Sequence, residues 1–267
     1  MHAKGETGEV RLRELSTPPW AKPTAEAFQH RLWEVDALRG LAVVLMIIFH
    51  FTWDLQFFGL VAVDVFSRPW QIFARGIGTA FIFLLGLSLA LRHQRGRLGL
   101  RYGLWRAGVL FGLGTLITLA TYGFVGDSYV RFGILHLLGV SVLLVLPFLG
   151  VPAWQSMLAG TGLIVVGALL NHTAAPFPWL IWLGVPQAGV TMVDYYPLLP
   201  WFGVALIGVA VGRMGFRDGR RAYPLPALGG SPPIRALSWL GQHSLLIYLL
   251  HQPLLIGFLI ALGAVTS

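Results

Sequence analysis

The chain has 267 residues, of which 56 % are apolar and only 11 % carry a charged side chain. Soluble domains carry charge on about 25 % of their residues, so a soluble enzyme, a disordered regulator and a disulfide scaffold all fit poorly. The composition is typical of a chain that lies mostly within a lipid bilayer. The sequence contains no cysteine, which excludes thiol catalysis and metals bound by cysteine.

Residues 1–30 form a polar, proline-containing lead that lacks the apolar stretch of a signal peptide, and we expect a mobile cytoplasmic tail there. The remainder, 31–267, is expected to be a single membrane domain. A spanning helix needs about 20 mostly apolar residues. This criterion predicts seven spans, at 37–58, 70–91, 103–123, 132–149, 152–170, 195–214 and 239–263. The predicted fold class is therefore an all-α, polytopic bundle of membrane helices.

One further apolar stretch, 176–186, is short and bounded by proline, which is typical of a re-entrant or interfacial segment.

The basic residues orient the predicted spans, because cytoplasmic loops carry an excess of Lys and Arg. Sixteen of the nineteen fall on one side if the N-terminus is cytoplasmic, leaving Arg68, Arg75 and Arg131 for the other. The C-terminus is then extracytoplasmic, and the cell membrane is the expected location. The basic residues that orient the spans also account for the net charge of +8, so we expect no nucleic-acid partner.

The first span contains four ionisable residues, Asp36, Arg39, His50 and Asp54. Ionisable side chains inside a span are costly, so each is a candidate functional residue. His50 and Asp54 are four residues apart and share one helix face, where the carboxylate could orient the imidazole for catalysis or where both could make a structural interhelical hydrogen bond. Asp36 and Arg39 also share a face, and a simple ion pair at the helix entry is an equal alternative.

Depth along the predicted spans places His50, His136 and His251 in one layer in the outer half of the bilayer, with Arg75 at a similar height. Three imidazoles and Asp54 would supply the four ligands of a zinc site. However, each histidine comes from a separate span and no HxxxH spacing occurs, so we expect no metal.

Two loop regions could also carry function. Asp194 lies with two tyrosines at the expected outer surface. The inner stretch from Arg92 to Arg106 is mainly a topology anchor, but its arginines could also clamp phosphate groups. The glycine-rich faces of the second and third spans indicate close helix packing, and they would also allow a homodimer.

Four segments of this sequence resemble one known family. They are RLWEVDALRGLAVVLMIIFHFTWDLQFFG from Arg31, TYGFVGDSYVRFGILHLLGVSVLL from Thr121, DYYPLLPWFGVALIGV from Asp194 and LSWLGQHSLLIYLLHQPLL from Leu237. They are similar to the heparan-α-glucosaminide N-acetyltransferase catalytic-domain family in its compact bacterial form, within the wider transmembrane acyltransferase superfamily. Lysosomal members keep a reactive histidine in the loop after the first span. This chain has none between Phe51 and Gln71, so either His50 takes that role or the chemistry differs.

The resemblance implies a membrane enzyme that moves an acetyl group from cytoplasmic acetyl-CoA to a hydroxyl or amine of an extracytoplasmic acceptor, and a glycan is the expected acceptor. His50, assisted by Asp54, is the expected general base or acyl-accepting nucleophile. Arg75, His136, Asp194 and His251 are candidates for oxyanion stabilisation or acceptor binding, and Arg39, Arg101 and Arg106 for binding acyl-CoA. A carrier or flippase that uses the His/Asp layer without acyl chemistry is the alternative, and a purely structural membrane subunit ranks below it.

Overall fold

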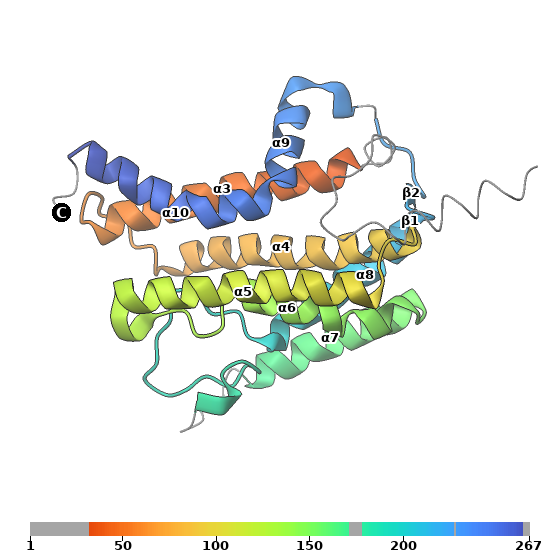
Figure 1. The fold of residues 1–267 in the computed structure, drawn as a ribbon, viewed down its shortest axis with the longest axis horizontal. Helices are drawn as coiled ribbons and strands as arrows, with labels where there is room; N and C mark the ends of the chain where they lie inside the picture. The colour runs from red at the N-terminus through yellow and green to blue at the C-terminus, as the bar shows by residue number, and fades with distance from the viewer. Residues whose placement is uncertain (1–31, 171–177, 227, 264–267) are drawn as a thin grey trace, which may run out of the picture. The chain divides into compact units, whose positions relative to one another are not determined.

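The computed structural model describes residues 32–170, 178–226 and 228–263, which form a bundle of α-helices (Figure 1). In chain order these are α3 (Trp33–Phe57), α4 (Arg68–Gln94), α5 (Leu100–Val125), α6 (Ile134–Leu144), α7 (Ala153–Leu170), α8 (Leu198–Gly215), α9 (Pro232–Gln242) and α10 (Ser244–Ala261). Four 3-10 turns connect them, η1 (Gly126–Ser128), η2 (Leu146–Leu149), η3 (Pro178–Leu180) and η4 (Leu228–Gly230). One antiparallel hairpin pairs β1 (Phe216–Arg217) with β2 (Arg220–Arg221). The predicted all-α class is confirmed, and the predicted tail at 1–30 lies outside the described residues.

Six helices of the described chain are long and apolar enough to cross a membrane, namely α3, α4, α5, α7, α8 and α10. Six of the seven expected spans therefore contain such a helix. The exception is 132–149, because α6 has 11 residues and a length of about 17 Å, against a hydrocarbon core of about 30 Å. Pro147 explains the early end of α6, since it cannot donate a backbone hydrogen bond and the chain continues as η2.

The last expected span, 239–263, is divided at His243, where α9 ends and α10 begins. In Figure 1, α9 stands across α3 while α10 runs alongside it. Two glycines allow the crossing, because a Cβ atom on Gly40 would collide with the carbonyl oxygen of Leu237 and one on Gly241 with that of Asp36. Within the apolar stretch at 176–186, the part from residue 178 onward contains η3 and turns rather than an eighth span.

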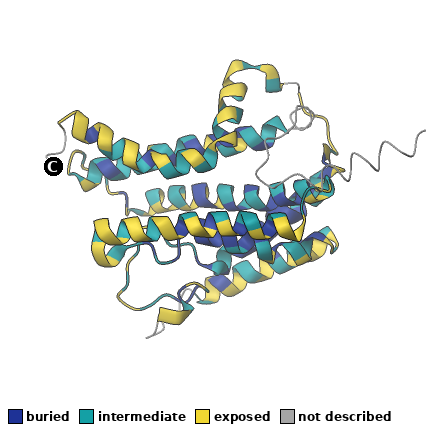
Figure 2. Cartoon of the chain, in the orientation of Figure 1, coloured by how far each residue is buried: buried dark blue, intermediate teal, exposed yellow. Residues whose placement is uncertain are grey.

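The core lies between α4, α5, α6 and α8, where Ile82, Leu137 and Leu206 are fully buried. Figure 2 shows this buried centre and the exposed outer faces of the surrounding helices. Small residues bring the backbones of α4 and α8 together, since a Cβ on Gly86 would collide with the carbonyl oxygen of Ala205. Helices in a membrane associate through such close packing, because lipid supplies no hydrophobic drive between them.

The start of α3, the connection from α4 to α5 and the β1–β2 hairpin meet at one end of the bundle, which we call the basic end (Figure 1). Arg221 donates two hydrogen bonds to the Glu34 carboxylate, at 2.6 and 2.7 Å. Gln94 and Arg95 hold the hairpin to the end of α4 through the carbonyl oxygens of Phe216 and Gly219. The helices thus gather the basic segments that the sequence assigns to one side. We call the other end, which contains the segment before α8, the opposite end.

The glycine crossing of α3 and α9 gives a first prediction. Gly40→Ala should lower the free energy of unfolding by about 1–3 kcal/mol, because the added methyl group meets rigid backbone. Gly76→Ala on α4 is the matched control, since nothing lies within 4 Å of its Cβ position and alanine favours helix. Thermal unfolding in detergent, followed by tryptophan fluorescence, measures both. Equal melting temperatures for the two variants would contradict the crossing.

Candidate active site

Two of the three predicted histidines meet where α3 and α10 pack together. The ring centroids of His50 and His251 are 4.7 Å apart in an edge-to-face arrangement. Nδ1 of His50 lies 2.9 Å from the carbonyl oxygen of Met46, and Nδ1 of His251 lies 2.7 Å from that of Tyr248. A carbonyl oxygen can only accept, so each Nδ1 carries a hydrogen, and each neutral ring keeps its lone pair on Nε2. The contact therefore joins two imidazoles whose basic nitrogens are both Nε2.

Asp54 lies one turn beyond His50, and its side chain is completely buried. Its hydrogen bond, however, crosses to α10, where Gln252 Nε2 donates to Oδ1. The expectation that Asp54 orients the His50 ring is therefore not met in this geometry, because the Met46 carbonyl holds that ring instead. Among the described residues, Asp54 Oδ2, His251 Nε2 and Gln252 Oε1 are buried without a hydrogen-bond partner. The α3–α10 contact thus contains three buried acceptor atoms without a hydrogen-bond partner.

His136 has different neighbours from the histidine pair, although its predicted depth is similar. Its ring packs between Phe111 of α5 and Phe132, at centroid distances of 4.9 and 5.6 Å. Gly114 makes room for the ring, since a Cβ there would lie 3.0 Å from His136. Equal depth therefore does not bring this histidine to the α3–α10 contact.

Asp194 and Arg75 lie toward the opposite end, and both are near Tyr196. The Asp194 carboxylate accepts a hydrogen bond of 3.0 Å from the backbone N–H of Ile134, at the start of α6. A carboxylate suits this place because the first N–H groups of a helix have no partner within it. Tyr196 lies against Gly78 of α4 and interacts electrostatically with both Asp194 and exposed Arg75.

Burial changes the ionisation of Asp194 and Tyr195, which precede α8 and lie outside the spanning helices. It raises the pKa of Asp194 to about 6, against an opposing effect of the Ile134 hydrogen bond. It also raises the pKa of Tyr195 to about 12, whose hydroxyl donates to the carbonyl oxygen of Ile181 at 2.8 Å. Both side chains are therefore more easily kept neutral than in water.

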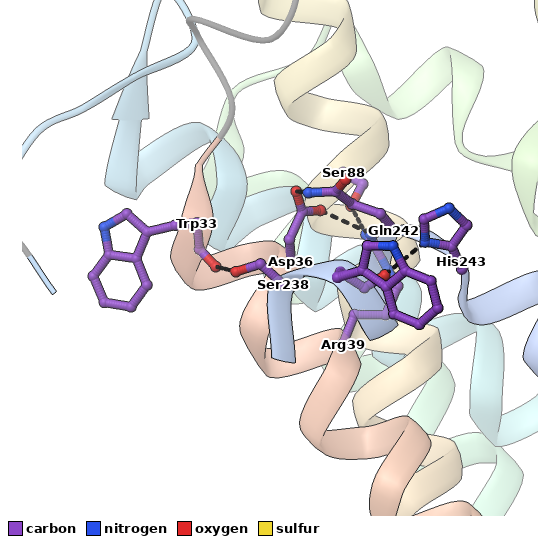
Figure 3. Close-up of polar contacts among 8 residues, drawn as sticks. Trp33, Asp36, Arg39, Ser88, Ser238, Gln242 and His243 are labelled. Carbon is purple, nitrogen blue, oxygen red and sulfur yellow. Dashed lines mark hydrogen bonds and ion pairs between the residues drawn. The ribbon is translucent and has the colours of Figure 1, made fainter. Parts of the chain in front are cut away.

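Arg39 stands at the centre of a polar cluster near the basic end, which links three helices (Figure 3). It contacts Asp36 Oδ1 at 3.3 Å and donates to the Ser88 hydroxyl of α4 at 2.6 Å. Gln242 of α9 donates to the other oxygen of Asp36 at 3.3 Å. The predicted Asp36–Arg39 ion pair is present, and it also ties α3 to α4 and α9.

Arg101 and Arg106 lie in the first two turns of α5, on the basic end. Arg101 is exposed and Arg106 half-buried. Arg106 is close enough to Arg92 of α4 for their charges to interact, and Arg92 itself stacks on Tyr102, 3.8 Å from the ring centroid. The clustering of these guanidinium groups is suited to an anionic ligand.

Two residues at the α3–α10 contact are absent from the sequence-based site. Gln252 holds Asp54, and the Tyr248 ring lies 5.7 Å from that of His251. Gln252 could have been found from the sequence, because it is a polar residue directly after His251 in an otherwise apolar span. Tyr248 has no comparable signal, because tyrosine is common in membrane helices near their ends. No group of three or more metal-ligating side chains occurs within the described ranges.

The fold and this contact define a class, a polytopic helical membrane protein with a histidine pair between two of its spanning helices. Residues 31–253 match the family described as "Heparan-alpha-glucosaminide N-acetyltransferase, catalytic". The chain belongs to this family, as its motifs indicate, and it is accordingly a membrane acetyltransferase. Comparisons with curated proteins and with solved structures gave no match.

The raised pKa of Asp194 predicts how stability depends on pH. A carboxyl group with a higher pKa in the folded state than its ordinary 3.8 stabilises the fold below pH 4 and loses this contribution as pH rises through about 6. Asp194→Asn can still accept from Ile134 but does not titrate. The melting temperature of the wild type relative to this variant should therefore fall between pH 4.5 and pH 7. A constant difference, or a rise, would contradict the burial of this carboxyl group.

Proposed function

We propose that this protein transfers an acetyl group from acetyl-CoA to a hydroxyl or amine on an acceptor at the opposite end of the bundle. The observation that supports this most is the His50–His251 pair, with both Nδ1 atoms committed to carbonyl oxygens. A base needs a free lone pair within reach of the proton it removes. His50 Nε2 keeps such a lone pair, and the proposal places the proton of the acceptor within its reach.

In the proposed reaction the acceptor oxygen or nitrogen attacks the carbonyl carbon of the thioester. The new C–O or C–N bond forms, and the C–S bond to CoA breaks. His50 Nε2 takes the proton of the acceptor and passes it to the departing thiolate, so that CoA leaves as a thiol. In a two-step variant, His50 Nε2 attacks the thioester first, so that the C–S bond breaks and CoA leaves as a thiolate. The acceptor then attacks the acetyl group, the bond to Nε2 breaks, and the proton of the acceptor goes to the thiolate. His251, in contact with His50, presents the lone pair of its own Nε2 and is proposed to stabilise the positive charge that develops on the His50 ring in either route.

The donor is proposed to bind at the basic end, with its phosphates against Arg101 and Arg106 and close to the Arg39 cluster. Several guanidinium groups gather there from α4, α5 and the hairpin. Arg39 and His50 are eleven residues apart on α3, or about 17 Å along the helix axis. The long arm of CoA would cover this distance, so phosphate binding and acyl transfer occur at different depths.

The acceptor is proposed to arrive from the opposite end, where Arg75, His136 and Asp194 lie. By the distribution of basic residues, the basic end faces the cytoplasm and the opposite end faces outward across the cell membrane. A glycan is the proposed acceptor. This arrangement explains why the histidine pair is remote from the arginines, because donor and acceptor approach from different sides.

His50→Ala should lower the rate of acetyl transfer by about 10²- to 10⁴-fold, because it removes the proposed general base. Release of free CoA from acetyl-CoA, with amino sugars and glycans as acceptors, can be followed with a thiol reagent, since the chain itself has no cysteine. Thr52→Ala removes a hydroxyl of α3 that donates only to the Ile48 carbonyl oxygen of the same helix, and it is the control. Full turnover by folded His50→Ala protein would remove His50 from the mechanism.

Acetyl-CoA should raise the melting temperature of the purified protein, because a ligand at 100 times its Kd stabilises the fold by about 2.7 kcal/mol. Arg101→Ala and Arg106→Ala should weaken this shift at fixed acetyl-CoA concentration. Arg68→Ala, which removes an exposed guanidinium from the start of α4 at the opposite end, should not. A carrier of an unrelated solute would show no shift with any variant, and that result would favour the alternative function.

A further inference from the structure

The position of α10 depends on few contacts. Of its 18 residues, only His251 and Leu259 are buried. The helix begins directly after the break at His243, and Pro253 lies within it. Proline has no N–H to donate to the carbonyl oxygen of the preceding turn, which makes a helix easier to bend. The ring of His251 is therefore carried by a helix that its own packing holds only weakly.

The hydrogen bond from Gln252 to Asp54 crosses the α3–α10 contact at the level of the histidine pair. Gln252 follows His251 directly, and Asp54 lies one turn beyond His50, so the two contacts are adjacent. The Asp54 side chain has no exposed surface. A buried hydrogen bond to such a group is strongly favoured, since losing the donor leaves a polar atom unpaired in an apolar surrounding.

We propose that Gln252 is a positioning residue for acetyl transfer. By donating to Asp54, it sets how far α10 is shifted and rotated along α3, and it thereby holds the His251 ring against His50. Among the described residues, no other side-chain hydrogen bond joins α10 to α3. The catalytic consequence rests on the proposed function, whereas the effect on helix position does not.

The effect on helix position is measured first, without any assay of activity. Because the chain lacks cysteine, nitroxide labels can be placed at Ile48→Cys on α3 and Phe258→Cys on α10, both exposed positions. Pulsed electron spin resonance then gives the distribution of distances between the labels. We expect a narrow distribution in the otherwise native protein, and a broadened or shifted one when Gln252→Leu is added. Leu254→Ala, on an exposed position of α10, is the control and should leave the distribution unchanged.

The catalytic effect is measured by steady-state kinetics on the unlabelled proteins. Gln252→Leu should lower kcat by about 10- to 100-fold, since small misplacements of catalytic groups have effects of this size. KM for acetyl-CoA should stay constant, because the arginines at the basic end are untouched. A general loss of folding would instead lower the yield of active protein and change both label distances and melting temperature.

The pH dependence of kcat in Gln252→Glu separates a positioning role from a purely structural one, because a purely structural role would leave that dependence unchanged. Two facing carboxyl groups can share a hydrogen bond only while one of them is protonated. The variant should therefore approach wild-type kcat at low pH and fall below it as pH rises. The other titratable groups at this contact, His50, His251 and Tyr248, are present in both proteins, so a pH dependence of the activity ratio arises from the new carboxyl group.

Unchanged label distances and unchanged kcat in Gln252→Leu would overturn the proposal. A wild-type protein without acetyl transfer to any acceptor would instead contradict the proposed function, and the label distances would still decide whether Gln252 positions α10. Altered distances with unchanged kcat would show that Gln252 holds α10 but does not position a catalytic group, which also overturns the proposal.

Discussion

A layer of polar side chains buried between two apolar helices is the constraint on which this protein depends. An ionisable group at the centre of a membrane helix costs about 2.5–3.5 kcal/mol on insertion scales. The α3–α10 contact nevertheless holds His50, His251 and Asp54 together. Hydrogen bonds offset part of this cost, since each ring is held through Nδ1 by a carbonyl oxygen of its own helix. The same bonds direct both lone pairs onto Nε2, which is the arrangement that base catalysis requires.

The remainder of the bundle places this layer between two chemically different ends. α3 connects them, because it carries Arg39 near the basic end and His50 about 17 Å further along its axis. Its position is set by backbone contact with α9 and by the Arg39–Ser88 hydrogen bond to α4. The core of α4, α5, α6 and α8 provides a rigid base for that helix. Fold and proposed function therefore depend on the same element, since a shift of α3 would disturb both the arginine cluster and the histidine pair.

Hydropathy and charge were sufficient to predict the six long helices, because a membrane span requires a long apolar run and flanking charge, but not the short α6 or the separate α9. The length of α6 follows from Pro147. A count of hydropathy alone does not register this proline, because the residues around it are apolar. Depth along a span predicted that His50 and His251 share a level, but depth carries no information about which way a helix faces. His136 shows this, because it shares the predicted level and packs against α5. The Asp54–Gln252 bond was beyond prediction, since a partner on another helix leaves no periodic signal.

A structure of the protein bound to a non-reactive ketone analogue of acetyl-CoA would test the central claim most directly. The account predicts that the phosphates lie against the arginines of the basic end. It also predicts that the ketone carbonyl, which stands in for the thioester, reaches the His50–His251 contact between α3 and α10. An analogue whose carbonyl lies outside hydrogen-bond reach of both imidazoles, or whose phosphates occupy the opposite end, would contradict it.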